Sequence, residues 1–424
     1  MGMPIAPARN HDRRTATQAR RKPAARRVRK DTPVERLRVH HRMEALLCLR
    51  DRGPMSQIEL CKALGRSTTT MSKVVTELEA LGWVEAAGNA RPREPGRPRV
   101  VLRLNQAACE ILCLSLEPEL VRSAVVGLDL VARDAREDSL ALSEGEPAAI
   151  LRRLTDWIRT RLAALARKSC RPAAVVLVMP GMTDTKLRQI RVSYQLGWRD
   201  LPLADHIEAK IGIPVIAHNN TRAMAFAEFR HKHLDADQPM LFVQAKYGVG
   251  ASMLNGITPS PHGHYGVSEL GHLRMGENRF ADRVPTDGTL VGVLREPYLR
   301  DVLDCRDTNI QIVEEMERRA NAKDKIAVAL FDQTIANLAL CLAVAINLQN
   351  PSIVVLGGIY AGLSDATLDR LLAEIARNVP DELMQPVRLS RTALGPAGAI
   401  QGAAIVGFDR LLRQPDTYRA VEAT

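Results

Sequence analysis

Short hydroxyl side chains and two cations cluster at the start of one predicted helix, which begins at Ser67. Apolar residues recur from Met71 to Leu81 at the spacing of a helix and define its buried face. The opposite face carries polar side chains whose lengths suit hydrogen bonds to base edges and phosphates in a major groove. The residues predicted to contact duplex DNA here are Arg66, Ser67, Thr69, Thr70, Ser72 and Lys73.

A second basic cluster follows this helix, in a loop rich in Arg and Pro. A strand is expected to begin at Gly82-Trp83-Val84-Glu85, and residues 100–104 read as the returning strand, so the loop forms the tip of a β-hairpin. Arg97 and Arg99 at this tip are placed to reach phosphates or a minor groove. The alternative is a small helical protein-interaction module whose Ser and Thr face is simply solvated.

Two further helices must position the predicted recognition helix. Apolar residues fall mostly at helical spacing from about Pro33, and Gly53-Pro54 ends that helix. Ser56 and Glu59 have the spacing of a capping box, which opens a short helix that stops at Gly65. A helix-turn-helix followed by a basic hairpin predicts a winged helix over residues 33–104.

Positive charge is concentrated at the N-terminus. The 424 residues carry a formal net charge of +11, and residues 1–30 alone hold ten Lys and Arg residues against one acid. We expect residues 1–32 to form a disordered basic arm. Binding of a polyanion and simple solvation remain equal alternatives for this arm.

Composition excludes several classes of protein. Apolar residues make up 46% and charged residues 25%, which is ordinary globular usage and excludes global disorder. No uninterrupted apolar run is long enough for a membrane span, and arginines interrupt any secretory core. The seven cysteines are scattered and contain no Cys-x-x-Cys pair, which favours buried free thiols in a reducing compartment. We therefore expect a cytoplasmic protein with no membrane partner.

The remainder, residues 105–424, shows strands first and then alternating helices and strands. Residues 111–116 and 123–128 read as paired strands, with 129–136 continuing the meander, and 173–179 as a buried strand. Amphipathic or apolar helices are expected at 147–166, 203–211, 221–231 and 326–348, and further strands at 213–217, 241–245, 250–254 and 353–356. This order predicts an α/β body in two lobes.

With these pieces in order, the chain resembles a transcriptional regulator of the ROK (repressor, open reading frame, kinase) family, over about residues 35–410. The matching segments are Gly96-Arg97-Pro98, Val178-Met179-Pro180-Gly181, Leu196-Gly197-Trp198, His218-Asn219-Asn220-Thr221-Arg222-Ala223, Tyr247-Gly248-Val249-Gly250, Glu269-Leu270-Gly271-His272, Leu356-Gly357-Gly358 and Gly402-Ala403-Ala404. The resemblance implies a winged helix-turn-helix followed by a two-lobed actin-like ATPase fold with a sugar cleft. It also implies homodimers or homotetramers that bind palindromic double-stranded DNA.

Departures from the family pattern remove its chemistry. The Gly-rich phosphate loop is replaced by Ser115-Leu116-Glu117-Pro118-Glu119-Leu120, whose carboxylates would repel a polyanion. The position of the catalytic Asp matches Asn220, and a neutral amide cannot act as a general base at pH 7. His272 matches the His of the zinc site, but residues 276–304 contain no cysteine. We expect no catalytic residue, metal or cofactor.

Four residues of a polyol-binding cleft survive in the resemblance: Asn219, Asn220, Glu269 and His272. Their amide, carboxylate and imidazole groups suit hydrogen bonds to the vicinal hydroxyls of a sugar or sugar derivative. The alternative is a buried polar network that ties loops together. The leading hypothesis is a sequence-specific DNA-binding transcriptional regulator, more specifically a repressor. The rivals are an ATP-dependent sugar kinase with a DNA-binding arm and a ligand-independent DNA-binding protein.

Overall fold

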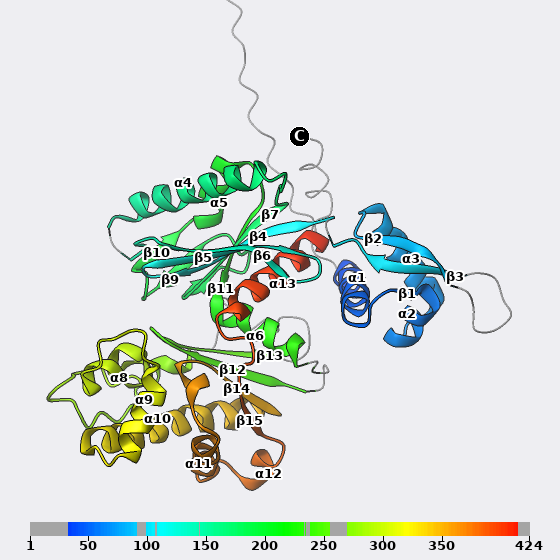
Figure 1. The fold of residues 1–424 in the computed structure, drawn as a ribbon. Coiled ribbons are helices and arrows are strands. Elements are labelled where there is room, and N and C mark those ends of the chain that lie inside the picture. The colour runs from blue at the N-terminus through cyan, green and yellow to red at the C-terminus, as the bar shows by residue number, and fades with distance from the viewer. Residues whose placement is uncertain are drawn as a thin grey trace, which may run out of the picture.

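The computed structural model describes residues 33–90, 99–106, 108–143, 145–232, 234, 238–254 and 269–413. The expected arm at 1–32, the wing tip at 91–98 and the segment 255–268 lie outside these residues. The described chain forms a small N-terminal module beside two larger lobes that are stacked one above the other (Figure 1).

The N-terminal module is a winged helix. Its elements are α1 (Pro33–Arg52), β1 (Met55–Ser56), α2 (Gln57–Leu64), α3 (Thr68–Ala80), β2 (Val84–Ala90) and β3 (Arg99–Leu104), and the strands lie in the order β1-β3-β2. The predicted capping box is present: the Ser56 backbone N–H donates to Glu59 Oε2 at 2.7 Å and the Glu59 N–H donates to Ser56 Oγ at 3.4 Å. Gly65 ends α2 with a left-handed φ of 61°.

The first lobe is built on a five-stranded sheet of order β11-β7-β4-β5-β6. Its strands are β4 (Glu110–Glu117), β5 (Leu120–Gly127), β6 (Ala132–Ser139), β7 (Ala174–Met179) and β11 (Val215–Asn219), and β4, β7 and β11 run parallel. Helices α4 (Pro147–Ala166) and α5 (Leu203–Ile211) cover one face, while α6 (Asn220–His231) and α13 (Ala397–Arg413) cover the other. A small sheet of β8 (Met182–Thr183), β9 (Ile190–Ser193) and β10 (Trp198–Leu201) lies beside it.

The second lobe has a four-stranded sheet of order β13-β12-β14-β15. Its strands are β12 (Met240–Ala245), β13 (Val249–Leu254), β14 (Ile353–Gly358) and β15 (Arg388–Arg391). Its helices are η1 (Leu270–His272), α7 (Leu290–Leu294), α8 (Glu296–Leu303), α9 (Ile312–Asn321), α10 (Lys325–Gln349), η2 (Ile359–Gly362), α11 (Asp365–Ala376) and α12 (Asp381–Met384). Among the described helices, α10 alone is long and apolar enough to cross a bilayer, but most of it is buried in this lobe.

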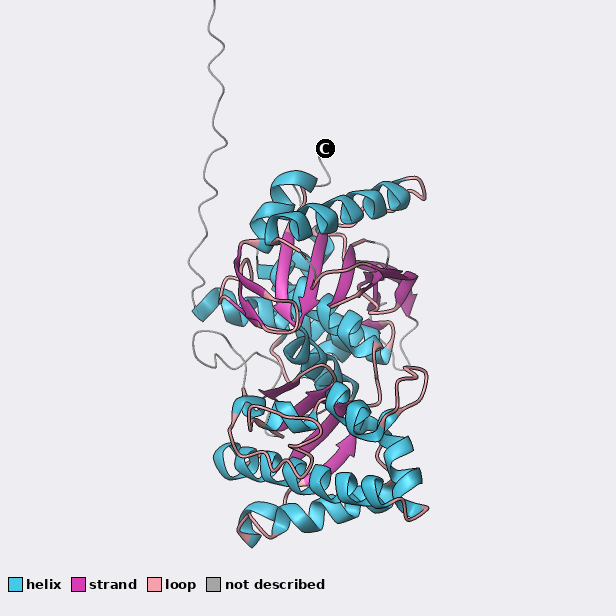
Figure 2. Cartoon of the chain, turned by 90° about the vertical axis from the view of Figure 1, so that its left-hand side faces the viewer, coloured by secondary structure: helices cyan, strands magenta, loops and turns pink. Residues whose placement is uncertain are grey.

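Helices α6 and α13 connect the three parts of the molecule. The outer face of the second sheet, with Phe242 and Val355, shares a hydrophobic core with α6 and α13. The same core includes the winged helix, where the Trp83 ring meets the Phe408 ring edge to face with centroids 6.3 Å apart. Figure 2 shows these helices between the two sheets. The winged helix is therefore docked on the body by apolar packing.

Candidate nucleic-acid interface and interlobe site

Helix α3 presents a polar face to solvent, as its sequence pattern predicts. Thr69, Ser72 and Lys73 are exposed, while Met71 and Val74 are buried against α1 and α2. The acid four residues beyond Lys73 is Glu77, which pairs with Arg38 and with Arg42 of α1. Lys73 makes no ion pair within the described chain, so its ammonium is available to a phosphate.

Two of the predicted DNA contacts form the cap of α3. The Thr70 backbone N–H donates to Ser67 Oγ at 3.1 Å, and the Ser67 and Thr70 hydroxyls lie 2.9 Å apart. Ser67 has extended backbone angles, as an N-cap requires. These two residues fix the start of the helix and thereby place Thr69 and Ser72.

Arg66 has a structural partner that its sequence position did not reveal. Its Nη2 atom donates to both carboxylate oxygens of Glu44 in α1, at 3.0 and 3.1 Å. Burial pushes the pKa of Glu44 upward, but hydrogen bonds from His40 and Arg66 outweigh it, so that the pKa lies below its usual value. Arg66 therefore braces the helix-turn-helix against α1, and its contact with the major groove stays a prediction.

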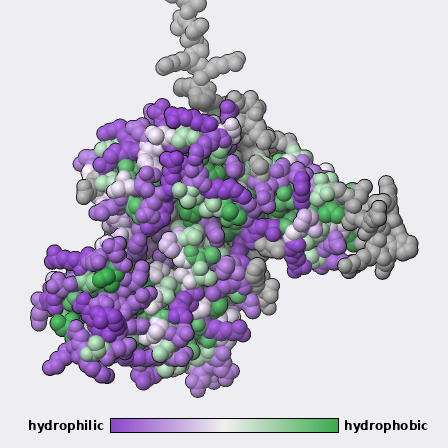
Figure 3. Space-filling view, in the orientation of Figure 1, coloured by the Kyte–Doolittle hydropathy of each residue, from purple (hydrophilic) through white to green (hydrophobic). Residues whose placement is uncertain are grey.

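The wing has the predicted hairpin geometry. Strands β2 and β3 pair antiparallel from Val84 opposite Leu104 to Ala90 opposite Arg99, with one bulge near Gly88. Arg99 begins β3, but its side chain lies outside the described residues, as does all of Arg97. Figure 3 shows the winged helix projecting from the side of the two lobes.

The predicted ligand residues in the first lobe lie where β11 passes into α6. Asn219 is buried and caps α6: its Oδ1 accepts from the Arg222 N–H at 2.9 Å, and its Nδ2 donates to the Gly181 carbonyl at 2.8 Å. Asn220 is half-buried, and its Oδ1 accepts from the Thr221 N–H at 2.8 Å. Within the described residues no acceptor takes up the Asn220 Nδ2 group, which leaves a donor for a ligand.

The predicted ligand residues of the second lobe are neighbours of each other. Glu269 Oε2 lies 3.6 Å from His272 Nε2, and both side chains are partly exposed. Burial raises the pKa of Glu269, although His272 opposes the shift. The ring of Tyr194, from the first lobe, lies 5.2 Å from that of His272.

Backbone packing brings the two pairs to the same interlobe region. Gly250 has no room for a side chain, because a Cβ there would overlap the Thr221 hydroxyl. Gly271 packs against Val249, the residue before Gly250: a Cβ on Gly271 would lie 2.7 Å from the Val249 carbonyl oxygen. Strand β13 thus joins the start of α6 to the turn that carries Glu269 and His272. The two polar pairs therefore lie on elements that pack against each other through β13.

Two residues near this site, His218 and Arg222, belong to a segment that the sequence analysis singled out but were not predicted as site residues. His218 is buried, and its Nδ1 lies 3.0 Å from the Asn219 carbonyl oxygen. Burial, reinforced by the charge of Arg222, lowers the pKa of His218 to about 4. Arg222 lies over the Phe226 ring at 5.9 Å from its centroid. A histidine inside an otherwise apolar strand was the available signal.

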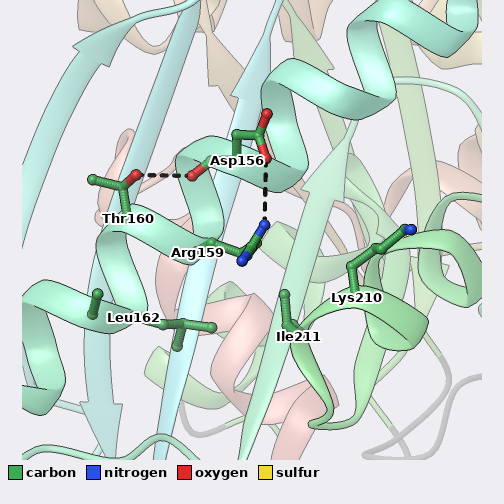
Figure 4. Close-up of a pocket in the computed structure, with 7 residues that line it drawn as sticks. Asp156, Arg159, Thr160, Leu162, Lys210 and Ile211 are labelled. Atoms are coloured by element: carbon green, nitrogen blue, oxygen red, sulfur yellow. Dashed lines mark hydrogen bonds and ion pairs between the residues drawn. The ribbon is translucent and has the colours of Figure 1, made fainter.

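A shallow groove between α4 and α5 is not part of this site. It lies on the opposite face of the first sheet from α6, and its lining residues are Asp156, Arg159, Thr160, Leu162, Ala163, Lys210 and Ile211 (Figure 4). Arg159 and Asp156 lie 3.9 Å apart, and the Thr160 hydroxyl donates to the Asp156 carbonyl oxygen. Its polar groups are therefore partly satisfied by one another.

The described residues contain no group of three or more His, Cys, Asp or Glu side chains that could hold a metal ion. His272 has Glu269 as its acidic neighbour, and the seven cysteines are free thiols. A structural zinc site needs four converging ligands, which the described residues around His272 do not provide.

Two family descriptions match this chain. The description "ROK family" matches residues 135–414, and "MarR family" matches residues 40–86. The chain belongs to the ROK family. The first match begins within β6 and covers the rest of the first lobe and the described second lobe. The second runs from within α1 to within β2 and so includes both α2 and α3.

Relatives of this ROK protein carry two kinds of name. A "Putative xylose repressor" of Caldicellulosiruptor sp. (strain Rt8B.4) is 22% identical over 86% of this chain and 94% of its own length. The "DNA-binding transcriptional repressor Mlc" of Escherichia coli (strain K12) is 20% identical over 84% of this chain and 89% of its own. A "Glucokinase" of Halalkalibacterium halodurans is 25% identical, but the match covers only 63% of this chain and 84% of its own length.

A solved structure shows the same fold. The ROK family transcriptional regulator described as a homolog of the E. coli MLC protein superimposes with a TM-score of 0.73 at 21% identity, over 92% of this chain and all of that one. The winged helix-turn-helix followed by the two-lobed ROK fold, expected from the sequence, is thereby confirmed.

Proposed function

We propose that this ROK protein is a sequence-specific DNA-binding transcriptional repressor whose winged helix reads the major groove with α3. The observation that carries the proposal is the exposed row Thr69, Ser72 and Lys73 on a helix whose other face is buried. Ser67 and Thr70 hold the start of this helix, and Arg66 braces it. The names of the two repressor relatives, each matched over more than four fifths of this chain, support the same function.

The wing and the oligomer complete the proposed interface. Arg97 and Arg99 would engage the flanking backbone or minor groove, and the basic front of the chain would add phosphate contacts. A homodimer or homotetramer with two-fold symmetry would match a palindromic operator with half-sites about one helical turn apart. Such a protein would act in the cytoplasm on double-stranded DNA.

Selection of bound DNA from a random pool with the purified full-length protein tests this function. We expect enrichment of a palindrome, with log K falling linearly as log salt rises. Lys73→Ala should weaken binding and reduce the salt slope by about 1, whereas the matched control Lys210→Ala on α5 should change neither. A pool without an enriched motif, or equal affinity of Lys73→Ala and wild type, would contradict the proposal.

We further propose that the interlobe region binds a sugar or sugar derivative as effector. Asn220 offers an amide donor, while Glu269 and His272 offer an acceptor and an imidazole, and Asn219 positions α6. A ligand that binds only the folded state raises the melting temperature by mass action. A thermal-shift series over neutral sugars should therefore give one concentration-dependent rise, reduced in Asn220→Ala. No shift with any sugar would favour the ligand-independent alternative.

We propose that the site performs no phosphoryl transfer. Asn220 stands where the family pattern has its catalytic Asp, and an amide cannot accept the sugar hydroxyl proton. The glucokinase relative keeps the family connection to sugar kinases, so the activity must be measured. A coupled ATP assay over a hexose panel should give no turnover, and a turnover that is lost in Asn220→Ala would establish the kinase alternative.

A further inference from the structure

The turn between β12 and β13, residues 246–248, contacts the first lobe through two side chains. Lys246 Nζ lies 2.6 Å from Glu117 Oε2, at the end of β4 in the first lobe. Gly248 faces the Gln195 side chain of the first lobe so closely that a Cβ there would overlap its Nε2 atom. Three elements far apart in the sequence therefore meet on one side of the interlobe region.

Glu117 is held in position by a second ion pair within its own lobe. Its second oxygen, Oε1, accepts from Arg122 Nη1 at 2.5 Å, and Arg122 is itself bonded to Glu137. The side chains of Glu117 and Lys246 are 17% and 35% exposed, so the pair is only partly screened by solvent. Lys246 also lies over the Tyr247 ring, 5.0 Å from its centroid. The carboxylate is held in place by its own lobe before it meets the lysine.

On the other side, backbone hydrogen bonds tie the turn to the second lobe. The Lys246 N–H donates to the Gly248 carbonyl oxygen at 2.9 Å, and the Lys246 carbonyl accepts from the Glu296 N–H at 2.7 Å. A displacement of Lys246 would therefore also displace the start of α8, to which its carbonyl is bonded. The lobes cannot separate here while Glu117 and Lys246 remain bonded.

The same turn runs directly into the proposed ligand site. Val249 and Gly250 follow it, and they pack on Gly271 and Thr221, the neighbours of His272 and Asn220. Tyr194 precedes Gln195 and lies against His272. Any movement of the turn relative to the first lobe therefore changes the separation of the ligand residues.

We propose that Glu117, Lys246, Gln195 and Gly248 form an interlobe clamp that holds the two lobes closed in the unliganded protein. Because the turn leads into the sugar site that we propose, the clamp sets the separation of the ligand residues there, and only this consequence rests on that proposed function. Breaking the ion pair leaves Glu117 bonded to Arg122, so the cost falls mainly on Lys246 and is reduced by salt.

Hydrogen exchange and small-angle X-ray scattering on the free full-length protein test the clamp without DNA or sugar. Lys246→Gln and Glu117→Gln should each speed amide exchange at residues 246–250 by about fivefold, as expected for a partly exposed ion pair. Each should also increase the radius of gyration. The double variant should be no looser than Glu117→Gln alone, because that substitution already removes the partner of Lys246 together with the charge that faces Arg122. The matched control Arg370→Gln, which breaks the 2.7 Å pair with Asp332 inside the second lobe, should leave residues 246–250 unchanged.

Gly248→Ala provides an independent test in which all charges remain. Its methyl group should displace Gln195 and loosen the same residues, and 1 M salt should loosen the wild type in the same way. Unchanged exchange and radius in all three variants would overturn the clamp, as would equal loosening in Arg370→Gln. These measurements do not involve an operator, so failure of DNA binding would leave their outcome intact.

Discussion

At the scale of single residues, His218 shows how burial sets the protonation of a side chain beside the proposed ligand site. Its pKa of about 4 results first from burial and then from the nearby charge of Arg222, while its hydrogen bond to the Asn219 carbonyl opposes the shift. In the unfolded chain the histidine has a pKa near 6.5. Between pH 6.5 and 4 the unfolded state therefore binds a proton at this residue, whereas the folded state does not. The folded state therefore loses stability as the pH falls from about 6.5 toward 4.

We predict that His218→Asn reduces this pH dependence. The side-chain amide can still donate to the Asn219 carbonyl, but it does not titrate. Between pH 7.5 and 5, the loss in unfolding free energy should be smaller than that of the wild type by roughly 2 kcal/mol. Urea unfolding at both pH values measures it, and the carboxylates contribute equally to both proteins. An identical pH dependence in the two proteins would show that His218 is not buried in its neutral form.

Arg66 gives a second prediction at this scale, because a structural cation and a DNA-binding cation respond differently. If its role is the bond to Glu44, then Arg66→Gln and Glu44→Gln should each lower the unfolding free energy by about 1 kcal/mol, and the double variant should lose no more than either. Denaturant unfolding of the four proteins gives this cycle. Tighter operator binding by Glu44→Gln, with unchanged stability, would instead show that Arg66 acts as a DNA contact.

The sequence predicted local contacts between neighbouring residues better than it predicted ion pairs between distant ones. The Ser56 and Glu59 capping box is a local pattern, so it could be read directly and is present in the structure. Arg66 and Glu44 are 22 residues apart, and Glu117 and Lys246 are 129 apart. No periodicity encodes such pairs, because they depend on how whole elements pack.

At the scale of elements, α6 and α13 are joined by a glycine contact. A Cβ on Gly402 would overlap the backbone carbonyl of Ala223, which cannot move without shifting α6. We predict that Gly402→Ala lowers the unfolding free energy by about 1–3 kcal/mol, despite the better helix propensity of alanine. Thermal or urea unfolding measures the change.

Gly398→Ala is the matched control on the same helix. Its added Cβ would lie 3.3 Å from the Leu394 side chain and 3.7 Å from the end of the Met224 side chain, and the nearest atoms outside its own helix all belong to side chains, so the variant should be far less destabilised. Equal losses in both variants would show that the α6–α13 contact is not as close as described.

Element prediction succeeded where the pattern was long and regular. Residues 147–166 and 203–211 were predicted as helices, and α4 and α5 have those bounds. Helix α13 was missed as a helix, because its glycines weaken the helical signal although they permit the close packing. The two-residue β1 was also missed, since it exists only by pairing with β3. Short strands of this kind have no period of their own.

At the scale of the whole molecule, one hydrophobic core passes from the second sheet through α6 and α13 into the winged helix. A winged helix on a loose tether would not sense the state of the lobes, whereas this one is packed on a helix that contacts α6. Trp83 and Phe408 form a buried aromatic contact at that junction. It is the place where docking of the DNA-binding module can be weakened without touching α3.

We predict that Phe408→Ala uncouples the winged helix from the body. Removing a buried ring should cost about 3–5 kcal/mol, and the substitution removes the ring that Trp83 of the winged helix contacts. Hydrogen exchange should then rise in α1 and in residues 81–84, and calorimetry should show the winged helix melting ahead of the lobes. Leu371→Ala, in the core of the second lobe, is the control: it should lower overall stability without selectively loosening α1. If the two variants give the same exchange pattern, the junction does not hold the winged helix, and signals between the lobes and the DNA must take another route.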